Sequence, residues 1–165
     1  MLTIEQYIKA FSKECAISIH LYGKMPPGGL DYRPTAGQRS TLELMRYLSY
    51  APYNGVRRIV AGDWNLGKPA NEVTKDMPPS DFPMRMAWQA EEVAGILRSA
   101  SLVALLEDDF TFPWKETMKK GEALVAHPLK WLTAYRMQLF LYLKAAGAGD
   151  LATPDIWHGR GAGSA

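Results

Sequence analysis

The chain has 165 residues, of which 47% are hydrophobic and 22% charged, proportions typical of one soluble globular domain with its own core. Its 19 basic and 17 acidic residues give a net charge of +2, a balance that argues against nucleic acid or an anionic membrane as a partner. The N-terminus has no basic region followed by an apolar block, and no apolar run reaches the length of a membrane span. We therefore expect a cytoplasmic protein without a signal peptide. The single cysteine, Cys15, cannot form an internal disulfide, and its apolar neighbours predict an inert buried thiol.

The first predicted element is a helix over residues 3–23, where apolar residues recur every three or four positions. Thr3 and Gln6 have the spacing of a capping box at its start. Residues 24–39 are rich in proline and glycine, so they predict a loop.

A second capping box, Ser40 with Glu43, predicts the start of the next helix. Pro52 should kink or interrupt that helix, because proline removes one backbone hydrogen bond and clashes with the preceding turn. We expect a further helical piece over residues 54–61.

The pattern of the second half predicts two more long helices. Residues 62–80 form a loop, and helical spacing then continues from Pro83 to Leu106. Residues 110–114 predict a short extended or irregular crossing. The last helix should begin at Lys120 or His127 and end at Ala146, followed by Gly147 as a C-cap.

Few segments alternate with a period of two, so four long helices joined by substantial loops predict an all-α four-helix bundle over residues 1–147. Glycine, proline and alanine dominate residues 148–165, which predicts a flexible C-terminal tail that packs loosely or is disordered.

The order and spacing of these elements resemble the DinB-like (DinB/YfiT) family of four-helix proteins. The resemblance covers roughly residues 5–145 and is carried by Gly37-Gln-Arg-Ser-Thr-Leu-Glu-Leu-Met-Arg-Tyr47, by His127-Pro-Leu-Lys-Trp-Leu-Thr-Ala-Tyr-Arg-Met-Gln138 and by Leu143-Lys-Ala-Ala-Gly147. It implies an up-down-down-up bundle that forms a homodimer. Many such proteins bind a divalent metal through three histidines, one on the second helix and a His-x-x-x-His pair on the last.

In this chain those three positions fall on Tyr47, Trp131 and Tyr135. An indole N–H is a donor only and cannot bind a metal. A tyrosine ligates zinc or nickel poorly unless it is ionised, and its pKa is ordinarily near 10. The comparison of positions therefore predicts that the three-histidine site is absent and that the protein carries no resident metal.

Two interpretations of these three aromatic residues remain open. They can be core residues whose side chains fill the volume that a metal occupies in similar proteins. Alternatively, they can line a pocket that holds a small apolar or planar ligand, with two hydroxyls and one indole N–H to orient it.

The other polar candidates predict structural roles. His20 could form a shifted metal site with Glu91 or Glu92, but a satisfied or half-exposed histidine is the simpler interpretation. Arg136 and Gln138 lie beside the aromatic pair, and Arg136 could pair with a carboxylate at a loop or a dimer interface. The acidic run at 107–109 is typical of a solvated helix end.

The sequence therefore predicts a bundle without the usual metal, which binds a small molecule or acts as a dimeric interaction domain. The alternative is a divalent-metal-dependent enzyme, of the thiol S-transferase or hydrolase type, that uses non-standard ligands. That alternative rests on the family resemblance alone.

Overall fold

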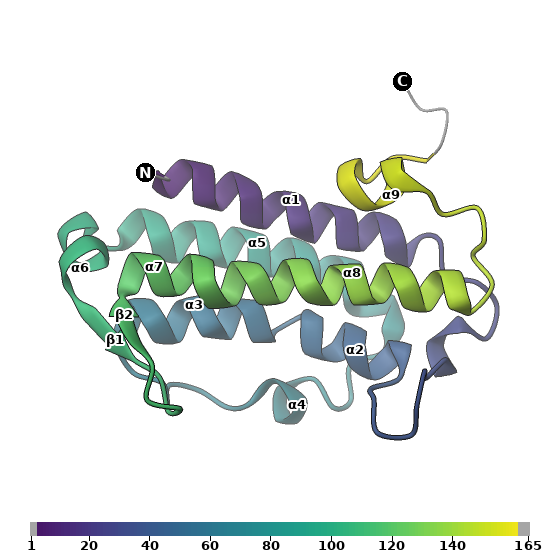
Figure 1. The fold of residues 1–165 in the computed structure, drawn as a ribbon, viewed down its shortest axis with the longest axis horizontal. Helices are drawn as coiled ribbons and strands as arrows, with labels where there is room; N and C mark the ends of the chain where they lie inside the picture. The colour runs from purple at the N-terminus through teal and green to yellow at the C-terminus, as the bar shows by residue number, and fades with distance from the viewer. Residues whose placement is uncertain (1–2, 162–165) are drawn as a thin grey trace.

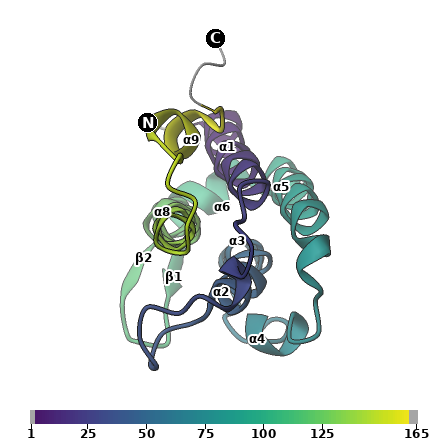
Figure 2. The ribbon, with the colours of Figure 1, turned by 90° about the vertical axis from the view of Figure 1, so that its right-hand side faces the viewer.

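The computed structural model describes residues 3–161 and contains four long helical segments packed side by side (Figures 1 and 2). The segments are α1 (Ile4–Tyr22), α2 (Thr41–Leu48) continued by α3 (Ala51–Ala61), α5 (Phe82–Ser99), and α7 (Lys120–Leu124) continued through a π-helical turn (Val125–Leu129) into α8 (Lys130–Ala145). Their directions follow the up-down-down-up order in Figure 1, which confirms the predicted all-α bundle.

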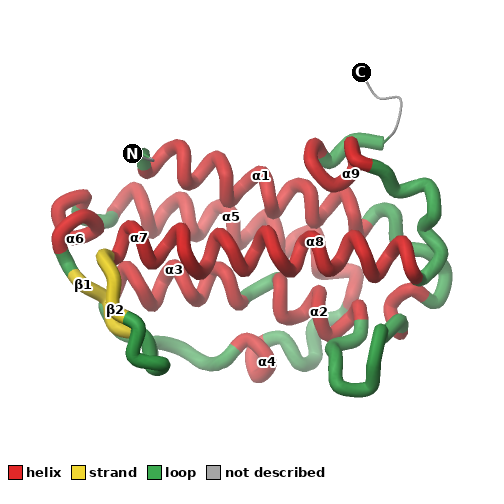
Figure 3. The backbone as a smooth tube through the Cα atoms, viewed as in Figure 1, coloured by secondary structure: helices red, strands yellow, loops and turns green. Residues whose placement is uncertain are grey.

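Shorter elements connect the long ones (Figure 3). They are the 3-10 turns Gly29–Asp31 and Pro79–Asp81, the helices α4 (Ala70–Val73), α6 (Leu102–Glu107) and α9 (Thr153–His158), and the strands β1 (Asp109–Thr111) and β2 (Thr117–Lys119). The two strands form an antiparallel hairpin in which Phe110 lies opposite Met118.

Local sequence signals determine where the first helices begin and break. Both capping boxes form: the Thr3 and Ser40 side chains accept backbone N–H groups, while Gln6 and Glu43 bond back to the cap residues. Pro52 lies in the first turn of α3, so the second helix is interrupted after Leu48 as predicted.

The third helix is shorter than the sequence predicted. It ends at Ser99 because Ala100 adopts an extended conformation and the Ser101 side chain caps a new helix, α6, by accepting the Ala104 N–H. The last helix begins at Lys120, and the wide turn at 125–129 accommodates Pro128, which has no N–H to contribute to a regular helix.

Apolar side chains from all four segments form one continuous core. Residues with no exposed surface include Phe11 of α1, Leu44 of α2, Met86 of α5 and Leu139 of α8. Cys15 is buried among them, and burial raises the pKa of its thiol, as expected for an inert cysteine. No helix in residues 3–161 has the length and hydrophobicity needed to cross a membrane.

Residues 148–161 differ from the loose tail that the sequence indicated. Helix α9 lies against α1 (Figure 1), and its Asp155 and Ile156 are buried. Asp155 Oδ1 lies 2.7 Å from His20 Nε2, and Asp155 Oδ2 accepts the Ala152 N–H at 2.9 Å. Residues 162–165, the end of the predicted tail, lie outside the described residues.

Arg136 adds a second link between α9 and the bundle. Its guanidinium, which is 1% exposed, donates to Glu14 Oε2 of α1 at 2.7 Å and to the Ile156 carbonyl at 2.6 Å. The carboxylate partner expected for Arg136 therefore lies within the same chain.

Asp155→Asn is expected to release α9. Burial opposes ionisation of Asp155, but the hydrogen bonds from His20 and Ala152 outweigh it and hold the pKa of Asp155 below its ordinary value. Its contribution to stability is thus present at neutral pH and lost as the pH falls below about 4. We expect the variant to lose about 1–3 kcal/mol of unfolding free energy at pH 7.

Hydrogen exchange measures this release directly, because amides of 156–158 should exchange faster in Asp155→Asn. Asp150→Asn is the control, since the Asp150 side chain is 75% exposed in the same segment. Equal exchange in the two variants at pH 7 would refute the role assigned to Asp155.

Candidate functional site

Tyr47 and Tyr135 meet between α2 and α8. Their ring centroids are 5.1 Å apart and the rings are inclined at 73°, an edge-to-face contact between two half-buried side chains. The Arg39 guanidinium lies 4.2 Å from the centroid of the Tyr47 ring. Two of the three predicted site residues are therefore in contact, and a cation covers one of them.

The environment of Tyr47 favours the neutral phenol. Burial raises the pKa of Tyr47, and the neighbouring Tyr135 raises it further, while the positive charge of Arg39 opposes the shift only in part. Metal coordination requires the phenolate, so this environment disfavours the one form of Tyr47 that could bind a metal.

Trp131 makes its ring contacts with a different set of residues. Its indole packs against Trp64 at 6.3 Å and His127 at 5.5 Å, within an aromatic cluster that also includes Phe110, Phe112 and Trp114. A Cβ built at Gly55 of α3 would lie 3.1 Å from both Trp131 and Pro128. Trp131 thus packs closely against α3.

His127 lies in the π-helical turn, beneath the β1–β2 hairpin. Its Nε2 is 3.2 Å from Glu116 Oε2 without hydrogen-bond alignment, and Glu116 also accepts the Trp114 indole N–H at 2.8 Å. The imidazole is 4.1 Å from the Phe112 ring, measured between centroids. Through these contacts His127 packs the last helical segment against the hairpin, one turn before Trp131.

Tyr47 also lines a cleft of about 660 Å³ formed by the 33–39 loop, α2 and the segment around α4. The cleft contains four basic side chains, Arg33, Arg39, Arg46 and Lys75, and one carboxylate, Glu43. Tyr47, Gln38, Asn71 and Thr74 add neutral polar groups. Such an arrangement of cations around a concave surface is suited to an anionic ligand.

The four cations of this basic cleft differ in how firmly they are held. Arg33 donates to Glu43 Oε2 at 2.8 Å and to the Gln38 carbonyl, and Arg46 Nε donates to the Met77 carbonyl at 2.9 Å. Lys75 Nζ lies 3.9 Å from Asp76 Oδ2. Within residues 3–161, Arg39 has no carboxylate partner, and its guanidinium makes a cation–π contact with the Tyr47 ring. Arg39 is therefore the cation most available to a ligand.

The remaining sequence candidates have structural partners. His20 lies against Asp155, so the shifted site with Glu91 or Glu92 is not formed, and both glutamates are exposed. Gln138 donates to the Tyr142 hydroxyl at 2.6 Å. In the acidic run, Asp108 pairs with Lys120 at 3.1 Å and Asp109 with Lys119 at 2.8 Å.

Among the described residues, no cluster of three or more histidine, cysteine, aspartate or glutamate side chains is arranged to hold a metal ion. Tyr47, Trp131 and Tyr135 supply no nitrogen or carboxylate ligand in its place.

The basic cleft was missed in the sequence because its residues come from three separate segments, the 33–39 loop, α2 and the segment around α4, which only the fold brings together. The available signal was the presence of three arginines between positions 33 and 46. Lys75 comes from a separate loop, and only the fold brings it to the same cleft.

No family model and no curated protein matches the sequence. The structure is similar to the crystal structure of a DinB-like protein, YjoA from Bacillus subtilis, with a TM-score of 0.66. The superposition covers 86% of this chain and 92% of that one at 15% sequence identity. At this identity the likeness concerns the fold, which is DinB-like.

Replacing all three aromatic residues, as Tyr47→His, Trp131→His and Tyr135→His together, is expected to create affinity for Zn²⁺ or Ni²⁺ if they occupy the metal positions of the family. Isothermal titration calorimetry measures the gain. The smaller side chains should cost about 2–5 kcal/mol of stability, mainly at Trp131. The control changes the same positions to phenylalanine, which adds no ligand, and equal metal affinity in the two triple variants would contradict the assignment.

Proposed function

We propose that the protein binds a small anionic molecule in the basic cleft, without the three-histidine metal site that the family resemblance implies. The observation that carries the proposal is the excess of cations in the cleft, where Arg33, Arg39, Arg46 and Lys75 face a single carboxylate, Glu43. The whole chain has a net charge of only +2, so this excess is local to the cleft. Opposite charge in a concave site raises both the affinity and the encounter rate of an anion.

The cleft offers two kinds of contact to one ligand. Guanidinium groups bind carboxylate or phosphate oxygens through paired N–H donors. The Tyr47 ring already holds the Arg39 guanidinium at 4.2 Å, which orients this group before a ligand arrives. Pre-orientation reduces the entropy lost on binding, so Arg39 is proposed as the main anion-binding residue, with Tyr47 as its support.

The variant Arg39→Gln should weaken anion binding about 10- to 100-fold, the range expected when a charge-assisted hydrogen bond is lost. Titration of inorganic phosphate and of citrate, followed by NMR chemical shifts, measures the change and locates the site. Affinity of the wild type should also fall as NaCl is raised, because salt screens exposed charges.

Lys9→Gln is the matched control, since Lys9 is an exposed cation on α1 outside the cleft. It removes the same unit of charge and should leave binding nearly unchanged. Equal losses in Arg39→Gln and Lys9→Gln would show a general charge effect and would overturn the proposed cleft.

The metal-dependent alternative is tested by the same purified protein. We expect elemental analysis to find no stoichiometric divalent metal, and Ni²⁺, Zn²⁺ and Mn²⁺ to leave the melting temperature unchanged, since a ligand stabilises only a folded state that binds it. About one metal per chain would favour the enzyme instead. The homodimer implied by the family resemblance is a separate proposal, which sedimentation at high protein concentration tests.

A further inference from the structure

We propose that a second, apolar cleft binds a small molecule with an aliphatic body and a cationic head group. This cleft lies at the α6 end of the bundle, away from the 33–39 loop (Figure 1), and has a volume of about 700 Å³. Pockets of 300–1,000 Å³ are typical of small-molecule sites. It shares no lining residue with the basic cleft, so the two proposals stand independently.

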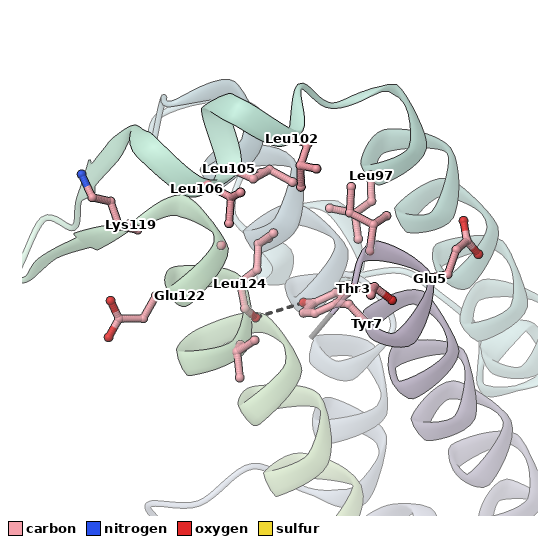
Figure 4. Close-up of a pocket in the computed structure, with 13 residues that line it drawn as sticks. Thr3, Glu5, Tyr7, Leu97, Leu102, Leu105, Leu106, Lys119, Glu122 and Leu124 are labelled. Carbon is pink, nitrogen blue, oxygen red and sulfur yellow. Dashed lines mark hydrogen bonds between the residues drawn. The ribbon is translucent and has the colours of Figure 1, made fainter. Parts of the chain in front are cut away.

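The interior of the apolar cleft is built from aliphatic side chains at the meeting point of α1, α5, α6 and α7 (Figure 4). Its walls include Ile4, Leu97, Leu102, Leu105, Leu106 and Leu124. Two hydroxyls line the cleft. That of Thr3 accepts the Gln6 N–H in the capping box, and that of the buried Tyr7 donates to the Leu124 carbonyl at 3.0 Å, the dashed line in Figure 4. Because this donor is already used, the interior favours an apolar ligand body.

Several wall residues are exposed although they are strongly apolar. Leu102 is 57% exposed, Leu106 39% and Val125 43%, whereas Leu97, Leu105 and Leu124 behind them are buried. Covering these side chains with a hydrocarbon would remove apolar surface from water, which is the main source of affinity for such a ligand.

The charges at the rim select the head group. Glu5 is paired with Arg98 at 2.9 Å, and Lys119 with Asp109 at 2.8 Å and with the Glu107 carbonyl at 2.7 Å. Glu122, by contrast, has no ion-pair partner among residues 3–161. Glu122 is among the lining residues of the cleft, and Figure 4 shows its side chain at the outer edge, extending outward from α7 and away from the leucine walls. The unbalanced charge at this rim is therefore negative, which favours a cationic head group and disfavours a carboxylate.

Three probes of equal chain length test this assignment: octylamine, octanol and octanoate, each titrated at pH 7 and followed through the methyl NMR signals of the leucines. Octylamine, which is protonated at this pH, should bind most tightly and octanoate most weakly. An exposed charge pair contributes modestly, so the preference for octylamine over octanol should be about 2- to 5-fold.

Two variants separate the contributions of the wall and the rim. Leu102→Gln should weaken all probes about 3- to 10-fold, since it removes one exposed apolar wall at nearly constant volume. Leu141→Gln is its control, because Leu141 is 55% exposed on α8 and does not line the cleft, and it should change nothing. Glu122→Gln should abolish the preference for octylamine while leaving the affinity for octanol unchanged.

Octanoate binding as tightly as octylamine, or a preference that survives Glu122→Gln, would overturn the cationic head group. Equal effects of Leu102→Gln and Leu141→Gln, signal changes outside the apolar cleft, or no binding of any probe would overturn the site itself. Phosphate titration of the same variants reports on the basic cleft, so failure of one proposal can be distinguished from failure of the other.

Discussion

The buried guanidinium of Arg136 is the constraint on which the packing of the last helix depends. A charge that is 1% exposed is tolerated only when its hydrogen bonds are satisfied, and Arg136 finds its acceptors on two other elements, Glu14 of α1 and the Ile156 carbonyl of α9. Loss of either acceptor would leave a buried charge with fewer partners. The position of α8 against α1 and the docking of α9 are therefore linked through one side chain.

This link explains why residues 148–161 pack against the bundle despite their composition. Glycine, proline and alanine are common there, and composition alone indicates a loose tail. The carbonyl of Ile156 and the carboxylate of Asp155 nevertheless satisfy two polar groups of the bundle, Arg136 and His20. Satisfying buried polar groups is specific to three-dimensional context, so no local sequence pattern predicts it.

The helical core was largely predictable because its determinants are local. Capping boxes at Thr3 and Ser40 and the proline at 52 specify where helices start and break, and the apolar period specifies which face is buried. The boundary at Ser99 was missed, since an apolar period that continues to Leu106 conceals the cap at Ser101.

The candidate site was harder to predict because its determinants are not local in the sequence. The spacing of Trp131 and Tyr135 correctly places them one turn apart, but Trp64 and the hairpin that surround Trp131 come from distant segments. The same is true of Lys75 in the basic cleft.

The absence of a side chain at Gly55 has a consequence for how this protein and its relatives can differ in sequence. A Cβ at Gly55 would lie 3.1 Å from Trp131 and from Pro128, so the glycine provides the space that the indole occupies. A smaller residue at 131 would leave a void beside α3, and a larger residue at 55 would fill it. Positions 55 and 131 should therefore covary among related chains, with small residues at 55 accompanying tryptophan at 131 and larger ones accompanying histidine.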